Sequence, residues 1–266
     1  MLKNNSRALR HSHSICVFDS SERKNYWHVP IYQKVRDYIA DGYSVIYILE
    51  PEVQATIQQM SSVGIEAQDH VVSGALTIIS NDIFYSPLVA SPILIEQWYK
   101  LFENIEKKNG KPKGFVAIGM PSSSFFTSLL YQEHLVEYES TVAKSYDGGV
   151  EALCCYTTRL MENMPLRHIV GILNAHQNIA HRDLSLSQWS AASGMTILKN
   201  GLIDALGTGG AEILFNALRR TLDINEDDVI LRPNDFENSL RTVLGSTAAE
   251  ITLEKLKGTF NKNIAF

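Results

Sequence analysis

The sequence predicts an α/β protein with a mostly parallel sheet covered by helices on both faces, followed by a small all-α domain. Through about residue 180, short apolar runs alternate with segments of helical period. The runs are nearly continuous in apolar residues, which is typical of strands buried on both faces. Beyond His181 no strong strand pattern follows, and glycines become frequent. Strand–helix alternation of this kind favours a parallel sheet.

The expected elements follow in chain order. The strand candidates are rich in β-branched and aromatic residues, and they cover 14–19, 43–49, 76–80, 114–120 and 151–157. The helix candidates between them cover 29–41, 52–63, 91–108, 123–145 and 166–174. Gly42 stands where a C-cap would end the first helix. Ligands of such sheets bind at the carboxyl ends of the strands.

The second part of the chain is predicted to be helical, with helices over 211–222, 235–244 and 248–257. Pro233 indicates a helix start and Gly245 a helix stop. We therefore expect an α/β domain over 10–182 and a small helical domain over 190–266. Asp and Glu outnumber Lys and Arg by 11 to 8 from residue 183 onward, which argues against a DNA-reading unit.

Composition narrows the class of protein. The 266 residues are 45% hydrophobic and 20% charged, which is ordinary for a globular chain, and the net charge is −5. An acidic chain is a poor general binder of nucleic acid. No apolar run reaches the length of a signal or membrane segment, and three cysteines are too few for a disulfide framework. These features predict a soluble, cytoplasmic protein that does not bind membranes.

The sequence offers no motif for phosphate binding. The junction after the first strand, 19–27, contains no glycine and no Gly-Lys-Ser/Thr, so it cannot readily wrap a phosphate. The glycine-rich stretch 207–210 opens a helix, but no strand precedes it. We interpret it as a flexible turn with a helix cap.

Metal and nucleophile motifs are also incomplete. His11, His13 and Cys16 are close in sequence, but no Cys-x-x-Cys is present. The serines of 122–124 lack the Gly-x-Ser-x-Gly elbow and are expected to cap the next helix. We therefore predict no catalytic residue, no metal and no cofactor. A small ligand could instead stack at the junction on Phe18, Tyr26 and Trp27.

Several segments, in this order, resemble the MEDS domain, the sensory domain named from methanogens, methylotrophs and DcmR. They are 13–22, 38–50, 138–139 and 153–156, and the resemblance spans about 10–180. It implies a RecA/KaiC-like sheet with a degenerate phosphate loop. It also implies a role in sensing, with small hydrocarbon derivatives as candidate ligands, in proteins that signal or regulate transcription. Two positions depart from the family pattern, with Ile15 in place of a cysteine and Phe18 in place of a tyrosine.

The candidate ligand-binding residues come from two sources. The resemblance implies His13, Asp19, Glu22, Tyr138, Glu139, Cys155 and Tyr156. Position at the carboxyl end of the sheet adds Ser20, Tyr26, Trp27, Glu50 and Ser122.

The sequence thus predicts a non-catalytic sensor that binds a small molecule and signals through its helical tail. The tail is similar to small helical output modules of archaeal signalling proteins, around 206–214 and 232–236. The expected partners are a small-molecule ligand and a protein that contacts the tail, and a homodimer with a second copy is also compatible with the sequence. Two competing functions are a DNA-binding transcriptional regulator and a KaiC-like nucleotide-binding enzyme.

Overall fold

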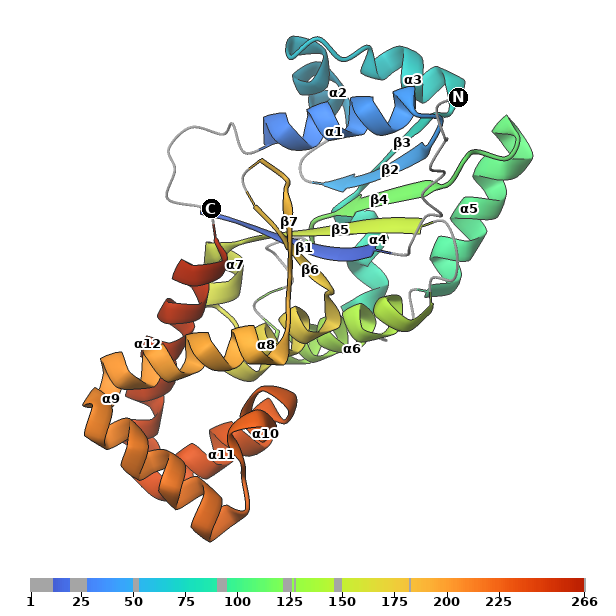
Figure 1. Cartoon of the computed structure of the whole chain (residues 1–266). Helices are drawn as coiled ribbons and strands as arrows, with labels where there is room; N and C mark the ends of the chain where they lie inside the picture. Colours follow the sequence, from blue (N-terminus) through green and yellow to red (C-terminus); the bar gives the residue numbers. More distant parts are fainter. Residues whose placement is uncertain are drawn as a thin grey trace, which may run out of the picture.

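The computed structural model describes residues 12–19, 28–49, 53–89, 95–121, 126, 128–145, 150–181 and 183–265. Strands and helices alternate through residue 180, and helices dominate the rest of the chain (Figure 1). Within the described residues, none of the helices combines the length and the apolar character needed to span a bilayer.

One seven-stranded sheet organises the α/β part. Its strands are β1 (Ser12–Phe18), β2 (Ser44–Leu49), β3 (Leu76–Ser80), β4 (Phe115–Gly119), β5 (Val150–Thr157), β6 (Asn178–Ala180) and β7 (Leu186–Gln188). Their order across the sheet is β3-β2-β4-β5-β1-β6-β7. Every neighbouring pair is parallel except β6 and β7. The predicted fold class, a mostly parallel α/β sheet followed by a helical region, is confirmed.

The helices of the α/β part are α1 (His28–Ala40), α2 (Val53–Ser62), α3 (Ala67–Ser73), α4 (Asn81–Tyr85), α5 (Ile95–Asn109), α6 (Leu129–Ser145), α7 (Thr158–Glu162) and α8 (Leu166–Ala175). A 3-10 turn, Ser86–Val89, follows α4. As predicted, Gly42 ends α1: its φ is +86°, and the N–H of Tyr43 reaches back to the carbonyl of Tyr38 at 3.0 Å.

The helices cover the two faces of the sheet in separate groups (Figure 1). Cys16 and Tyr47 face α1 and α2, and they share a buried cluster with Ile31 of α1. Ile15 and Ile46 belong to a second cluster, which includes residues of α5, α6 and α8. Successive residues of β1 and β2 therefore point to opposite faces, and both faces are apolar because both are covered.

Three expectations about the elements need correction. A helix was expected over 123–145, but residues 126 and 128 are not α-helical, and α6 begins at Leu129. The strands β6 and β7 have three residues each, too short to give a sequence pattern, and β7 lies in the stretch where no strong strand was expected. A helical segment also precedes residue 211, because α9 spans Ala191–Leu222 and is interrupted only at Gly207, where φ is +74°.

Four helices form the tail: α9, α10 (Glu226–Leu231), α11 (Pro233–Leu244) and α12 (Ser246–Ile264). Pro233 begins α11 and Gly245 ends it, as predicted. Gly201 allows α9 to approach α12 closely, since a Cβ there would lie 2.8 Å from a methyl group of Leu256. The buried core of the tail is continuous with that beneath α8. The predicted division into 10–182 and 190–266 stays a prediction.

A buried carboxylate of the tail caps a helix of the α/β part. Glu237 of α11 accepts the backbone N–H of Arg167, in the first turn of α8, and the Arg167 guanidinium, both at 2.8 Å. The Glu237 side chain is 3% exposed. A negative charge at a helix N-terminus satisfies an otherwise unpaired N–H and interacts favourably with the helix dipole. This contact therefore fixes α11 against α8.

We predict that Glu237→Gln lowers the free energy of unfolding by about 2–3 kcal/mol, because it leaves Arg167 without its anion. Glu250→Gln is the matched control: Glu250 is 56% exposed and pairs with Arg241 at 2.9 Å. The control should lose less than about 1 kcal/mol. Urea unfolding of the two variants measures both values, and equal losses would contradict the capping role.

Candidate functional site

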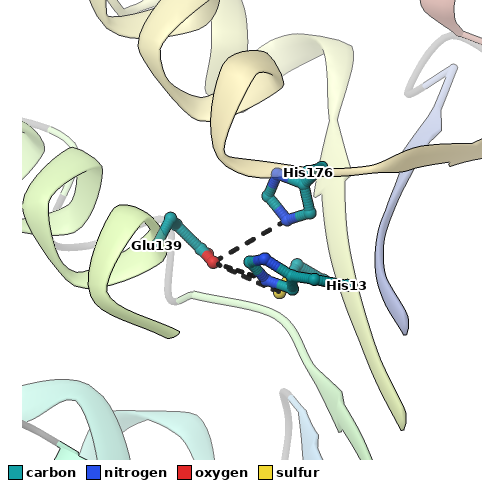
Figure 2. A group of neighbouring side chains, drawn as sticks. His13, Glu139 and His176 are labelled. Atoms are coloured by element: carbon teal, nitrogen blue, oxygen red, sulfur yellow. Dashed lines mark hydrogen bonds and ion pairs between the residues drawn. The ribbon is translucent and has the colours of Figure 1, made fainter. Parts of the chain in front are cut away.

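Four polar side chains converge in the core between the sheet and the helices α6 and α8. They come from separate elements: His13 from β1, Glu139 from α6, Cys154 from β5, and His176 from the residue after α8. Figure 2 shows the two imidazoles turned toward the Glu139 carboxylate. We call these four residues the Glu139 cluster.

The parallel pairing of β1 with β5 brings two members together. Ile15 pairs with Cys154, and His13 pairs with Ala152. Because side chains alternate along a strand, His13 and Cys154 both point to the face covered by α6. The N–H of Gln177 donates to the carbonyl of His13 at 2.8 Å, which holds the end of α8 beside β1. His176 is therefore placed over His13, with 4.0 Å between the ring centroids.

The side-chain atoms of the Glu139 cluster are close and almost fully enclosed. Glu139 Oε2 lies 3.2 Å from His13 Nε2, 3.4 Å from Cys154 Sγ and 3.7 Å from His176 Nε2. His13 Nε2 also lies 3.3 Å from Cys154 Sγ. Cys154 is 9% exposed, and the other three are at most 3% exposed. The four side chains therefore interact mainly with one another rather than with solvent.

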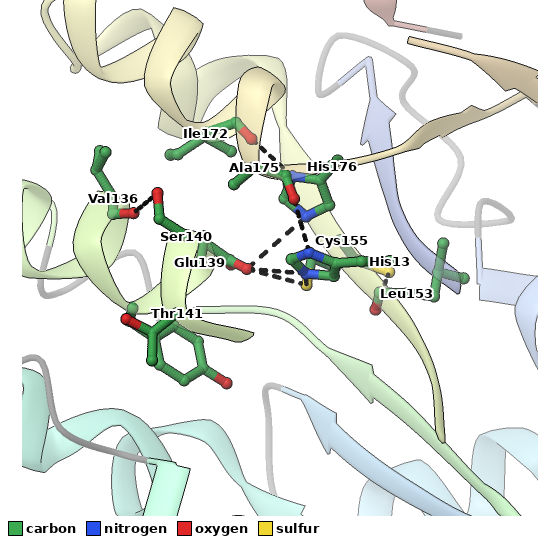
Figure 3. A network of polar contacts seen from close by, with 12 residues as sticks. His13, Val136, Glu139, Ser140, Thr141, Leu153, Cys155, Ile172, Ala175 and His176 are labelled. Atoms are coloured by element: carbon green, nitrogen blue, oxygen red, sulfur yellow. Dashed lines mark hydrogen bonds and ion pairs between the residues drawn. The ribbon is translucent and has the colours of Figure 1, made fainter. Parts of the chain in front are cut away.

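Backbone carbonyls fix the orientation of both imidazoles (Figure 3). His13 Nδ1 lies 2.9 Å from the carbonyl of Ala175, and His176 Nδ1 lies 2.7 Å from that of Ile172. A carbonyl oxygen can only accept a hydrogen bond, so each Nδ1 must carry the proton. In a neutral imidazole, each Nε2 then presents a lone pair toward Glu139.

Burial and hydrogen bonding shift the ionisation of the site in opposite directions. Burial would raise the pKa of Glu139, but a hydrogen bond from His13, which requires a proton on both of its ring nitrogens, the nearby imidazoles and the Tyr156 hydroxyl lower it to about 2. Burial lowers the pKa of His176 to about 3. Burial and the Glu139 charge raise the pKa of Cys154 well above its usual value. At neutral pH these shifts favour a carboxylate, a neutral His176 and a thiol.

The other Glu139 oxygen has a partner of its own. Tyr156 of β5 donates its hydroxyl to Glu139 Oε1 at 2.5 Å. Burial, together with the Glu139 charge, raises the pKa of Tyr156 well above 10, so the hydroxyl keeps its proton and remains a donor. The Glu139 carboxylate is thus held from both sides.

The structure brings together three of the predicted site residues: His13, Glu139 and Tyr156. Tyr138 instead accepts a hydrogen bond from Trp98 Nε1 at 2.8 Å, and Cys155 lies in the buried cluster on the opposite face of the sheet. The predicted residues that lie outside the described part of the chain are Ser20, Glu22, Tyr26, Trp27, Glu50 and Ser122. The ligand-binding roles of all these residues stay predictions.

The sequence reasoning missed Cys154 and His176. Cys154 could have been found, since adjacent residues of a strand face opposite sides and only one of the two cysteines can share a face with His13. His176 gave no comparable signal, because it follows the expected 166–174 helix and lies far from His13 in the sequence.

A cavity of about 520 Å³ lies at the carboxyl end of β1 and β5, against α12. Asp19 and Thr158 line it from the sheet side, and Lys257 and Asn261 line it from α12. Ala265, just beyond α12, pairs with Val17 of β1. We call this the α12 cavity. It lies at the end of the sheet where a ligand was predicted, although the tail contributes much of its lining.

Asn261 is the unusual residue of the α12 cavity. It is 6% exposed, and neither atom of its side-chain amide has a hydrogen-bond partner within the described residues. A buried polar group without a partner costs free energy, so such groups are rare in folded proteins.

We predict that Tyr156→Phe lowers the free energy of unfolding by about 1.5–3 kcal/mol, because it removes a hydrogen bond to a buried charge. Tyr138→Phe is a matched control, since that hydroxyl bonds the neutral Trp98 side chain. The control should lose about 0.5–1.5 kcal/mol. Chemical unfolding at pH 7 measures the two values, and a smaller loss for Tyr156→Phe would be inconsistent with an ionised Glu139.

Comparison with known proteins identifies the family. No match was found among curated proteins. Among solved structures, the chain is similar to the ATP synthase subunit NeqB from Nanoarcheaum equitans, with 12% identity over 95% of this chain and 74% of that one and a TM-score of 0.40. That score does not show a shared fold. The MEthanogen/methylotroph, DcmR Sensory domain matches residues 12–177, more than half of the chain. The chain therefore belongs to the MEDS family of sensory domains.

Proposed function

We propose that this protein is a non-catalytic sensor, in which the MEDS domain binds a small molecule and the helical tail relays its presence to a protein partner. The family match supports a sensory role. The α12 cavity supports the position of the ligand, because its volume is within the range of small-molecule sites. It also lies at the carboxyl end of a parallel sheet, where ligands of α/β proteins bind.

The unpartnered amide of Asn261 is the observation that carries the proposal. Its residue lines the α12 cavity, and because both amide atoms are enclosed, a rotation of the side chain would bring them to the donor or acceptor of a bound molecule. A site of this kind discriminates strongly between a ligand that forms the bond and one that cannot, since the second leaves the amide unpaired.

Contacts of α12 support the relay. Lys257 donates to the carbonyl of Glu162 in α7 at 3.3 Å and pairs with Glu254 of its own helix at 2.6 Å. Ala265 pairs with the carboxyl end of β1. A ligand in the α12 cavity would therefore touch the sheet and the tail together, and its binding energy could shift α12 relative to the sheet.

The lining of the α12 cavity favours a small molecule with a polar group. Charged side chains from both sides line it, including Asp19, Glu162 and Lys262. A hydrocarbon derivative that carries a hydroxyl, amine or carboxylate would fit this lining better than a plain hydrocarbon, because the charged groups keep polar partners.

Calorimetric titration of the full chain with a panel of small alcohols, amines and carboxylates tests the proposal. Asn261→Ala should weaken binding of the selected compound by at least about tenfold, since a hydrogen bond is lost. Stability without ligand should be little changed, because the amide has no partner to lose within the described residues. Asn263→Ala is the control, as Asn263 is on the same helix and exposed.

Hydrogen exchange then tests the relay. Saturation with the selected compound should slow exchange in α12. Binding that leaves exchange in α12 unchanged would contradict the relay, and a protein that takes up none of the compounds would contradict the sensor. ATP turnover would favour a nucleotide-binding enzyme instead, and salt-sensitive binding to a specific DNA would favour a transcriptional regulator.

A further inference from the structure

We propose that the Glu139 cluster is a structural binding site for a divalent metal ion of the zinc type, with His13, Glu139, Cys154 and His176 as its four ligands. This inference goes beyond the proposed sensing function. His13 is near the amino end of β1, whereas Asp19 in the α12 cavity follows its carboxyl end. Six residues of a strand span about 20 Å, so the two sites are separate.

The ligand atoms have the spacing of a tetrahedral site. Zinc binds imidazole nitrogen at about 2.0–2.1 Å and thiolate sulfur at about 2.3 Å, which places neighbouring ligand atoms about 3.3–3.6 Å apart. Four of the six separations between ligand atoms are 3.2, 3.3, 3.4 and 3.7 Å. The other two, from His176 Nε2 to His13 Nε2 and to Cys154 Sγ, are at most 4.8 Å, and a bound ion would bring His176 to tetrahedral spacing.

With both imidazoles neutral, the one proton that the Cys154 thiol donates to Glu139 does not satisfy all of these atoms. Both Nδ1 atoms donate to carbonyls, so in the neutral imidazoles both Nε2 atoms offer lone pairs, as does Glu139 Oε2. His176 Nε2 is buried and has no hydrogen-bond partner within the described residues. Convergent lone pairs with too few protons are stabilised by a cation.

Charge and second-layer contacts fit the same ion. Two neutral imidazoles, one carboxylate and one thiolate neutralise a divalent cation, which reduces the cost of burying the charge. Zinc-bound histidines commonly donate the other ring nitrogen to a carbonyl, and zinc-bound carboxylates are themselves hydrogen-bonded. The carbonyls of Ala175 and Ile172 supply the first of these contacts here (Figure 3). The hydroxyl of Tyr156 supplies the second.

The donor set selects the metal and the role. Nitrogen and sulfur ligands in tetrahedral geometry favour zinc over magnesium or calcium, which prefer oxygen. Four protein ligands leave no open position, as in structural rather than catalytic sites. On binding, the Zn–S bond forms as the S–H bond of Cys154 breaks, and the proton passes to solvent. The bound ion would fasten β1, β5, α6 and the end of α8 together.

Elemental analysis of the tag-free, full-length protein tests the site first. We expect one zinc per chain after dialysis, and removal of the metal with a strong chelator should lower the Tm by about 5–15 °C. Anaerobic reconstitution with Co²⁺ should then produce the charge-transfer absorption of a cobalt–thiolate bond.

Cys154→Ser should abolish that absorption and weaken zinc binding by more than about 100-fold, beyond the usual effect of a second-layer contact. Cys16→Ser is the matched control, because Cys16 is also buried but faces the opposite side of the sheet. His176→Gln provides a second variant if Cys154→Ser does not fold.

Three results would overturn the proposal. The first is a wild-type protein that contains no zinc and takes up neither zinc nor cobalt after reconstitution. The second is equal metal binding by Cys154→Ser and Cys16→Ser. The third is a cobalt complex of the wild type without the thiolate absorption. In each case the Glu139 cluster is an internal polar network.

Discussion

The carboxylate of Glu139 lies inside the core, where an unpaired charge would cost several kcal/mol. The surrounding side chains place polar groups against both carboxylate oxygens. Tyr156 holds one oxygen, and the other faces two imidazoles and a thiol. The elements that supply these groups must keep their register, because a shift of one residue in β1 would turn His13 to the other face of the sheet.

The need of buried carboxylates for partners links distant parts of the chain. Glu139 is on α6, which packs on α8, and His176 follows the end of α8. The beginning of α8 is in turn capped by Glu237 of the tail. Glu237 thus fixes the first turn of α8, and the bond from the Gln177 N–H to the His13 carbonyl holds its other end beside Glu139.

The two polar features of the molecule differ in kind. The Glu139 cluster is enclosed, and its atoms face one another, which favours a rigid role. The α12 cavity is larger, is lined by two parts of the chain, and contains an amide without a partner among the described residues. Only the second has room for an organic molecule.

The sequence by itself determined five of the seven strands, most of the longer helices and the family. Continuous apolar runs marked five strands. Their alternation with helices implied a parallel sheet, because the strands of such a sheet are covered on both faces and therefore lack polar positions. Local chemistry marked helix ends at Gly42, Pro233 and Gly245. The family resemblance indicated His13, Glu139 and Tyr156. Only the tertiary structure decided that Cys154 and His176 join them, since strand register and the end of α8 set those distances. Contacts between residues far apart in the sequence leave no local pattern, so the tail's place beside the sheet was equally hidden.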